Sequence, residues 1–304
     1  MANMLNVDTL QLFADIVDTG SFSRAAERNY LSQSAVSQRL RALEREYGTT
    51  LIYRGKGKGS ATPTTAGDVL YTGAKRILRE ASMLDSQLRE SPGELSGTVR
   101  LVTVYSVGLH ALPPRLKPFL AGHPLVNVHL EYKRTDEVYQ AVVADTADIG
   151  IVACPGPRRG LDVIPFGDEE MVVICAPEHS LAKRSTVRLT DIDGLPFFGF
   201  DTDIPTRKLI EERLAVRGVR VRMSATFDNI ETIKNLVEIG NGISIVPAET
   251  VNHEVRAGAL VAIPLAESDA FRRPTGLLVK PGIADRAVLR EFIEAMRSRS
   301  LPDN

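Results

Sequence analysis

The stretch that decides the fold is residues 21–54, which read SFSRAAERNYLSQSAVSQRLRALEREYGTTLIYR. A helix is predicted to begin after Ser32, whose hydroxyl can cap a helix N-terminus, and to end at Gly48. Between these two residues the apolar side chains are spaced four and three apart, as on one face of a helix: Val36, Leu40 and Leu43. Such a helix buries one face against neighbouring helices, and the residues before it supply them.

Two helices are expected ahead of it. Residues 7–17 carry apolar side chains at helical spacing, and Gly20 ends that run. The second helix is expected over residues 24–31, with Ser23 as its cap. Small residues where the second and third helices meet allow a close and steep crossing: Ala25, Ala26 and Ala35. This arrangement predicts a helix-turn-helix from Phe22 to Arg41.

The exposed start of the third helix carries short uncharged side chains that can hydrogen-bond base edges in a major groove: Gln33, Ser34, Ser37 and Gln38. A polar helix face that contacts only water is the alternative. From Arg24 to Lys58 the chain has eight basic and three acidic residues, although its formal net charge is −1. A local basic patch of this kind fits a polyanion-binding module, but a solvated charged face has the same composition.

Residues 50–67 read TLIYRGKGKGSATPTTAG and predict two short strands around a glycine-rich basic tip. This is the pattern of a wing, whose Arg54, Lys56 and Lys58 can contact phosphates or enter a minor groove. The glycines do not have the G-x-x-x-x-G-K-[ST] spacing of a phosphate-binding loop. The head is therefore expected to be a winged helix-turn-helix.

This region resembles the DNA-binding domain of the LysR-type transcriptional regulators. The similarity covers about sixty residues, and its most specific part is A-A-x-x-x-x-x-S-Q-S-A-V-S, from Ala25 to Ser37. The wing departs from the family pattern, because it is about two residues longer and has Pro63 where a leucine is usual. The resemblance implies that double-stranded promoter DNA is the partner, with these residues at the interface: Gln33, Ser34, Ser37, Gln38 and Arg54.

Residues 65–91 predict one long linker helix, which starts at a T-x-x-D capping box, Thr65 and Asp68, and stops before Pro92. Its apolar residues follow a heptad seam: Leu70, Ala74, Ile77, Ala81, Leu84 and Leu88. A solitary helix packed on its own domain is the alternative. The resemblance implies a homodimer formed through this helix, and further assembly of two dimers into a homotetramer.

An internal repeat organises the rest of the chain. Two segments each read strand, helix, strand, helix, strand, and at an offset of 94 residues Thr135 matches Asn229 and Glu137 matches Glu231. Such a repeat predicts two similar α/β lobes. The chain is expected to cross between them near residues 166–171 and again near residues 272–276. This layout resembles the effector domain of the same family and also the periplasmic solute-binding proteins.

The ends of the predicted strands should converge on one cleft between the lobes, because ligands of open α/β sheets bind beyond the carboxyl ends of the strands. The candidate effector-binding residues are Ser106, Val107, Thr135, Thr202, Asp203 and Asn229. Each could equally be an ordinary helix cap. Caps and helix dipoles favour a small anionic effector, whereas the nearby aspartates could bind an amine. Arg134 and Arg207 are candidate counter-charges.

No catalytic constellation is visible in the sequence. The five histidines have neither metal-ligand spacing nor a nucleophile partner: His110, His123, His129, His179 and His253. Cys154 and Cys175 each lie in an apolar run and are expected to be buried, reduced thiols. We therefore expect no enzyme activity, no cofactor and no metal.

Composition favours an ordinary globular chain, since 43% of the residues are hydrophobic and 25% are charged. No apolar run of about 18 residues is present, and the N-terminus lacks the pattern of a signal peptide. A cytoplasmic location with no membrane partner is expected. An exported solute receptor would leave residues 1–90 unexplained, and an architectural DNA protein would leave the two lobes unexplained.

The expected fold class is therefore α/β with an all-α N-terminal head. Its parts are a winged helix-turn-helix over 1–67, a linker (dimerisation) helix over 65–91, and a two-lobed effector-binding domain over 95–304, similar to periplasmic binding proteins. Lobe one is expected over about 95–166 plus 273–304, and lobe two over about 167–272. The expected function is sequence-specific DNA binding modulated by a small-molecule effector; the alternative is a solute-binding receptor without a transcriptional role.

Overall fold

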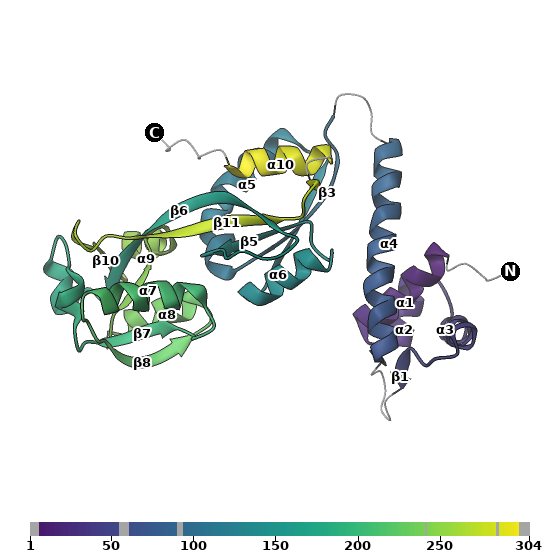
Figure 1. The fold of residues 1–304 in the computed structure, drawn as a ribbon, viewed down its shortest axis with the longest axis horizontal. Helices are drawn as coiled ribbons and strands as arrows, with labels where there is room; N and C mark the ends of the chain where they lie inside the picture. Colours follow the sequence, from purple (N-terminus) through teal and green to yellow (C-terminus); the bar gives the residue numbers. More distant parts are fainter. Residues whose placement is uncertain (1–5, 55–60, 90–93, 241, 284–285, 298–304) are drawn as a thin grey trace. The chain divides into compact units, whose positions relative to one another are not determined.

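The computed structural model describes residues 6–54, 61–89, 94–240, 242–283 and 286–297 (Figure 1). It forms two compact units. The first is Met1–Glu94 with Ala144–Thr146, and the second is Leu95–Val143 with Ala147–Asn304. Each unit is described by itself.

Three helices form the head: α1 (Val7–Thr19), α2 (Phe22–Arg28) and α3 (Gln33–Tyr47). The predicted ends of α1 and α3 are confirmed, because Gly20 and Gly48 both adopt φ = 61°, the left-handed conformation that closes a helix. The predicted cap of α2 was wrong by two residues. Ser21 is the cap, because its backbone is extended and its hydroxyl accepts a hydrogen bond from the Arg24 amide.

The core of the head is built from the predicted apolar faces. Val36, Leu40 and Leu43 of α3 are buried, and so are Ala25 and Ala26 of α2. The wing follows as an antiparallel pair, β1 (Ile52–Arg54) and β2 (Ala61–Pro63). The tip with Lys56 and Lys58 lies outside the described residues, as does the side chain of Arg54.

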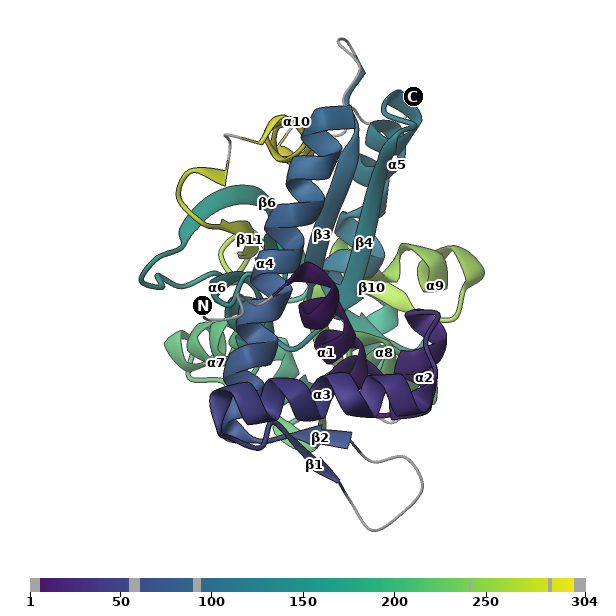
Figure 2. The ribbon, with the colours of Figure 1, turned by 90° about the vertical axis from the view of Figure 1, so that its right-hand side faces the viewer.

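The linker helix α4 (Thr65–Arg89) covers most of the predicted span, whose last residues, 90–91, lie outside the described residues; its cap is Thr64 rather than Thr65. The Thr64 hydroxyl accepts the hydrogen bond of the Gly67 amide at 3.0 Å, which a side chain inside the helix could not do. Figure 2 shows α3 and the wing at the end of the head where α4 begins, with α4 extending away from them.

Lobe one contains the parallel strands β3 (Gly97–Thr103), β4 (Val126–Tyr132) and β5 (Ile149–Ala153). Its helices are the π-helical turn η1 (Val107–Ala111), α5 (Pro113–Gly122), α6 (Thr135–Val143) and α10 (Ala287–Arg297). The apolar face of α10 packs into the lobe with Phe292 and Met296 fully buried.

Lobe two repeats this plan with β7 (Pro196–Phe200) parallel to β8 (Arg222–Phe227), and a parallel bridge from Phe197 to Ile243 beside β9 (Ser244–Pro247). Its helices are α7 (Pro205–Val216), α8 (Ile230–Glu238) and α9 (Asn252–Ala257). Short 3₁₀ turns complete it: η2 (Ser180–Lys183), η3 (Leu189–Ile192) and η4 (Ala248–Val251). The internal repeat of the sequence is thus a repeat of strand–helix units.

Two long strands run between the lobes (Figure 1), β6 (Asp162–Cys175) and β11 (Arg272–Val279). They pair with each other from Asp162 to Glu170, after which β6 pairs in lobe two with β9 and β10 (Val261–Pro264). The central sheet has the order β10-β6-β11-β5-β3-β4. Among the described residues, no helix combines the length and apolar composition needed to cross a bilayer.

Candidate functional site

The first two turns of α3 present polar side chains on the surface of the head. Gln33, Ser34 and Gln38 are exposed, and Ser37 is half-buried. The Ser32 hydroxyl accepts a hydrogen bond from the Ala35 amide at 3.2 Å and fixes the start of the helix. The four predicted reading residues therefore share the first two turns of α3, and three of them are exposed.

Glu44, which enters the sequence analysis only as one of three acidic residues in the basic stretch, connects α3 to the wing. Glu44 Oε1 accepts hydrogen bonds from the backbone amides of Leu51 at 2.9 Å and Ile52 at 3.4 Å. Beside it, exposed Arg41 and Arg45 line a shallow hollow with Gln38. Both arginines lie on the same helix as the uncharged polar face, and they add positive charge beside it.

A cleft lies between the two lobes of the effector unit; we call it the interlobe cleft. Lobe one contributes polar groups from the ends of β3 and β4, and lobe two contributes the start of α7 and α8. Its lining is Val104, Tyr105, Ser106, Lys133, Arg134, Thr135, Ala153, Phe200, Ile204, Pro205, Thr206, Asp228, Ile230 and Arg273. The lobes are close together, and the free volume is about 40 Å³, room for a few water molecules.

Arg273 forms the floor of the interlobe cleft. Its side chain is 1% exposed, and its Nη1 donates to Ser106 Oγ in lobe one and to Thr206 Oγ1 in lobe two, both at 3.2 Å. Its Nε lies 2.7 Å from Glu169 Oε2, the residue directly opposite on β6. One guanidinium thus joins both lobes and both crossing strands. Loss of the Glu169 carboxylate would leave a buried charge without compensation.

Arg134 closes the mouth of the cleft. It lies in lobe one, and its guanidinium contacts three carboxylates of lobe two: Asp203 at 2.9 Å, Asp228 at 3.1 Å and Asp201 at 3.3 Å. The hydrogen bond to Asp228 and the charges of the other aspartates raise the pKa of Arg134 above its ordinary value. A second bridge joins His110 Nε2 of lobe one to Glu231 Oε1 of lobe two at 2.8 Å. The lobes are therefore joined by polar contacts at both floor and mouth.

The candidate effector residues are not all in the cleft. Ser106 and Thr135 line it, as the strand-end argument predicts. Val107 is fully buried at the start of η1, and Asn229 caps α8 by accepting from the Glu231 amide at 2.8 Å. Thr202 is exposed and does not line the cleft, while Asp203 contacts Arg134 at its mouth.

The sequence interpretation missed Thr206, Glu169 and Arg273. Thr206 is 1% exposed and lies in the first turn of α7, one residue after Pro205, whereas Thr202 precedes the helix. Glu169 and Arg273 lie within the two predicted crossings, at residues 166–171 and 272–276. The available signal was that one crossing contains an acidic residue and the other a basic residue. A charge buried on one strand needs an opposite charge nearby, so the two residues could have been predicted to pair.

The cysteines are free thiols, as the sequence predicts. Cys175 is buried and Cys154 is partly buried, and desolvation raises the pKa of each to about 11. Both thiols are therefore protonated near neutral pH and weakly nucleophilic. Within the described part of the chain, no group of His, Cys, Asp and Glu has the arrangement of a metal site.

Comparison with known families gives two matches. A model described as the LysR substrate binding domain matches residues 92–300, and a model described as a bacterial regulatory helix-turn-helix protein of the lysR family matches residues 7–68. The chain is 26% identical over 248 residues to the HTH-type transcriptional regulator CysL of Bacillus subtilis, covering 82% of each chain. It is 27% identical over 297 residues to a probable RuBisCO transcriptional regulator of Synechocystis, covering 94% of this chain and 85% of the relative.

Solved structures share the fold. Full-length CbnR complexed with its target DNA superposes with a TM-score of 0.75 at 20% identity, covering 96% of this chain and 99% of CbnR. A full-length OxyR variant from Pseudomonas aeruginosa has a TM-score of 0.74 at 18% identity, covering 98% and 96%. With both domain models matched over most of its length, this chain belongs to the family of LysR-type transcriptional regulators, DNA-binding proteins that carry an effector-binding domain.

Proposed function

We propose that the chain reads promoter DNA through α3 and the wing, and that a small molecule in the interlobe cleft controls this binding. The base-reading side chains are Gln33, Ser34, Ser37 and Gln38, with Arg54 on a phosphate. The exposure of this polar face on the first two turns of α3 supports the assignment. The proposed domains are a DNA-binding domain over 1–67, a linker over 65–91 and an effector-binding domain over 95–304.

The proposed assembly is a homodimer through α4. The seam divides into two parts. Leu70 packs against the core of the head and Ala74 is fully buried, whereas Ile77 and Leu84 are 42% and 58% exposed. Two exposed apolar residues seven apart on one helix match the spacing of a coiled-coil contact. We further propose that two such dimers pair into a tetramer, that the protein works in the cytoplasm where promoter DNA lies, and that it catalyses no reaction.

The observation that carries the effector proposal is the convergence of Ser106, Thr206 and Arg273, from two lobes and three different elements, on one cleft floor. A ligand that touches both lobes binds the closed and open forms differently, and only such a difference can shift a conformational equilibrium. Because the closed cleft has a free volume of only about 40 Å³, ligand entry requires the lobes to separate.

The test uses Thr206→Val, which keeps the volume of the side chain and removes its hydroxyl. A panel of small carboxylates, phosphates and amines is first screened by thermal shift on the wild type, and a hit is titrated by calorimetry. We expect Thr206→Val to lose about 1–3 kcal/mol of binding, the cost of leaving a buried polar partner unsatisfied. Its DNA affinity without the hit should equal that of the wild type.

The matched control is Thr202→Val, the same substitution on an exposed residue of the same lobe. Thr202→Val should bind the hit as the wild type does. The DNase footprints of Thr202→Val and of the wild type should both change when the hit is added. Equal affinity of the wild type and Thr206→Val for the hit would contradict the assignment of the cleft.

A further inference from the structure

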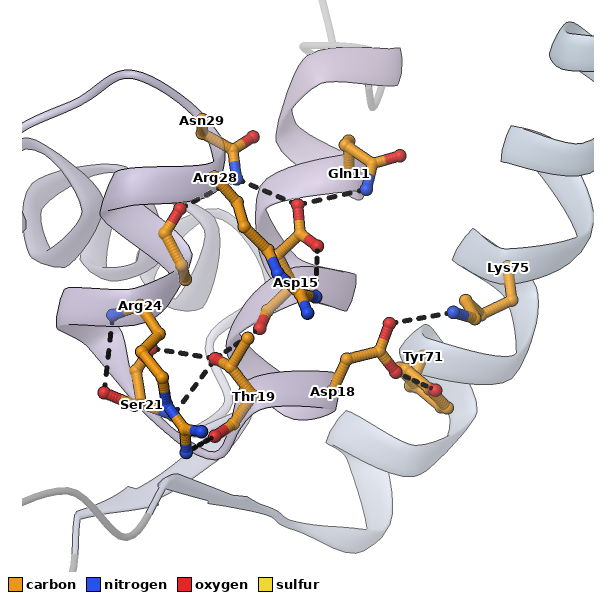
Figure 3. A network of polar contacts seen from close by, with 11 residues as sticks. Gln11, Asp15, Asp18, Thr19, Ser21, Arg24, Arg28, Asn29, Tyr71 and Lys75 are labelled. Atoms are coloured by element: carbon orange, nitrogen blue, oxygen red, sulfur yellow. Dashed lines mark hydrogen bonds and ion pairs between the residues drawn. The ribbon is translucent and has the colours of Figure 1, made fainter.

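Helix α1 carries two carboxylates three residues apart, Asp15 and Asp18, that contact two different parts of the head (Figure 3). Asp15 is 7% exposed. Its Oδ2 accepts from Asn29 Nδ2 at 2.9 Å and from Gln11 Nε2 at 3.0 Å, and its Oδ1 accepts from Arg28 Nη1 at 3.3 Å. Since Asn29 begins the turn between α2 and α3, Asp15 ties α1 to the helix-turn-helix.

Asp18 faces the linker helix instead. Its Oδ1 accepts from the hydroxyl of Tyr71, and its Oδ2 accepts from Nζ of Lys75 at 2.8 Å. Both donors lie on α4, four residues apart and therefore on one face of that helix. The Lys75 ammonium lies 5.5 Å from the centroid of the Tyr71 ring, so the two donors also support each other.

Apolar packing also joins α4 to the head, since partly buried Leu70 packs against the core of the head and Ala74 of α4 is fully buried. Burial of apolar surface is not directional, so by itself it allows small rotations of one helix on the other. A carboxylate with one donor on each oxygen has a defined geometry and selects one angle. Asp15 then connects α1 to the end of α2 and to the turn that leads into α3.

We propose that Asp18 is a positioning residue for DNA recognition: it sets the angle between the reading head and the linker helix, and thereby the half-site separation that two heads accept. This inference rests on the proposed dimer through α4. In dimeric helix-turn-helix proteins the half-site spacing follows from the geometry of the two heads, so a looser head should tolerate more spacings without losing its contacts to a single half-site.

The side chains involved are partly exposed, with 28% exposure for Asp18 and 36% for Lys75. Partly exposed pairs contribute little to overall stability. The Asp18→Asn variant, which keeps the shape and removes the charge, should therefore fold. Tyr71→Phe removes one of the two donors and should give a smaller change in the same direction. Asp8→Asn is the matched control, an exposed aspartate on the same helix.

The probe is a duplex that the wild-type chain selects from a random DNA library, together with versions in which one or two base pairs are added or removed between its half-sites, and a duplex with one half-site. Affinity for each is measured by fluorescence anisotropy. We expect Asp18→Asn to bind the single half-site as the wild type does. Its preference for the native spacing should fall by about threefold to fivefold, the size of effect that a partly exposed polar pair supports.

An equal loss of affinity on one and two half-sites would overturn the inference, since it would mean a general loss of structure. An unchanged spacing profile in a variant that stays dimeric by light scattering would overturn it while leaving the proposed dimer intact. A wild-type chain that is monomeric would overturn both the inference and the proposed dimer, whereas a dimeric wild-type chain that shows no spacing preference would overturn the inference alone.

Discussion

At the scale of single residues, Arg273 and Glu169 form a deeply buried ion pair between the two crossing strands. Both are almost fully buried, at 1% and 4% exposure, and Arg273 Nη2 lies 2.6 Å from Glu169 Oε2. Glu169 Oε1 has no hydrogen-bond partner among the described residues. The pair therefore depends on one shared carboxylate oxygen, and the removal of either charge leaves the other buried without compensation.

Glu169→Gln should lower the free energy of unfolding by about 3–5 kcal/mol, because it leaves the buried Arg273 guanidinium without a counter-charge. Urea denaturation followed by circular dichroism measures the change. Glu170→Gln is the control, since Glu170 is the next residue on β6 and is exposed. Equal stability of the two variants would show that the ion pair does not hold the crossing strands together.

Gln38 tests base reading at the same scale. It is exposed on the second turn of α3. Gln38→Ala should cost about 1–3 kcal/mol on the selected duplex and relax the preference at one base pair. Arg54→Ala should instead weaken binding to every sequence and flatten the dependence on salt, because a phosphate contact releases counterions. Salt titrations on selected and random duplexes distinguish the two, and parallel behaviour would contradict the division between reading and anchoring.

At the scale of elements, α4 has two roles along its length. Its N-terminal half belongs to the head, where Ala74 is completely buried, and its later residues Ile77 and Leu84 are exposed. A mutation at Leu70 or Ala74 would therefore damage the head and the seam together. A test of dimerisation should therefore change Ile77 and Leu84, because their exposed side chains are not part of the core of the head.

Ile77→Glu combined with Leu84→Glu should convert the dimer to a monomer, because two unpaired charges on a buried seam are strongly unfavourable. Light scattering of the full chain measures the mass. Val69→Glu is the control, since Val69 is 73% exposed on the same helix but outside the seam. A double variant that keeps the mass of the wild type would mean that the chains associate through another surface.

At the scale of the whole effector unit, polar contacts hold the two lobes together without a ligand. Arg134 contacts three carboxylates and His110 contacts a fourth, all across the cleft. Exposed ion pairs are individually weak and sensitive to salt. The aspartates also repel one another, so the cluster favours closure only while the guanidinium is present.

Arg134→Gln should shift the ligand-free lobes toward the open form, because three aspartates then face one another without a cation. Spin labels at exposed Val143 in lobe one and Val216 in lobe two report the distance between the lobes, in a background in which Cys154 and Cys175 are replaced by alanine. We expect a longer and broader distance distribution for Arg134→Gln. The wild type should approach it at high salt.

Arg158→Gln, which removes an exposed arginine elsewhere in lobe one, is the control and should leave the distribution unchanged. If Arg134→Gln also leaves the distribution unchanged, packing at the cleft floor rather than charge at its mouth holds the lobes closed.

The sequence by itself determined the helices and strands of the head, the linker and the lobes, because the signals for each element lie within a few residues of one another. Helix faces are read from residues three and four apart, and the ends at Gly20 and Gly48 follow from a single residue that tolerates positive φ. Errors in the predicted helix ends were small. At Ser21 and Thr64 the predicted cap was a neighbouring residue whose hydroxyl could also have capped the helix.

Only the tertiary structure decided which polar residues meet. Glu169 and Arg273 are 104 residues apart and face each other because β6 and β11 pair in one register. Thr206 rather than Thr202 reaches the cleft because α7 starts at Pro205, and the first turn of the helix turns inward. Local patterns specify elements, whereas the floor and mouth of a cleft are set by the register and packing between distant elements, which no local spacing encodes.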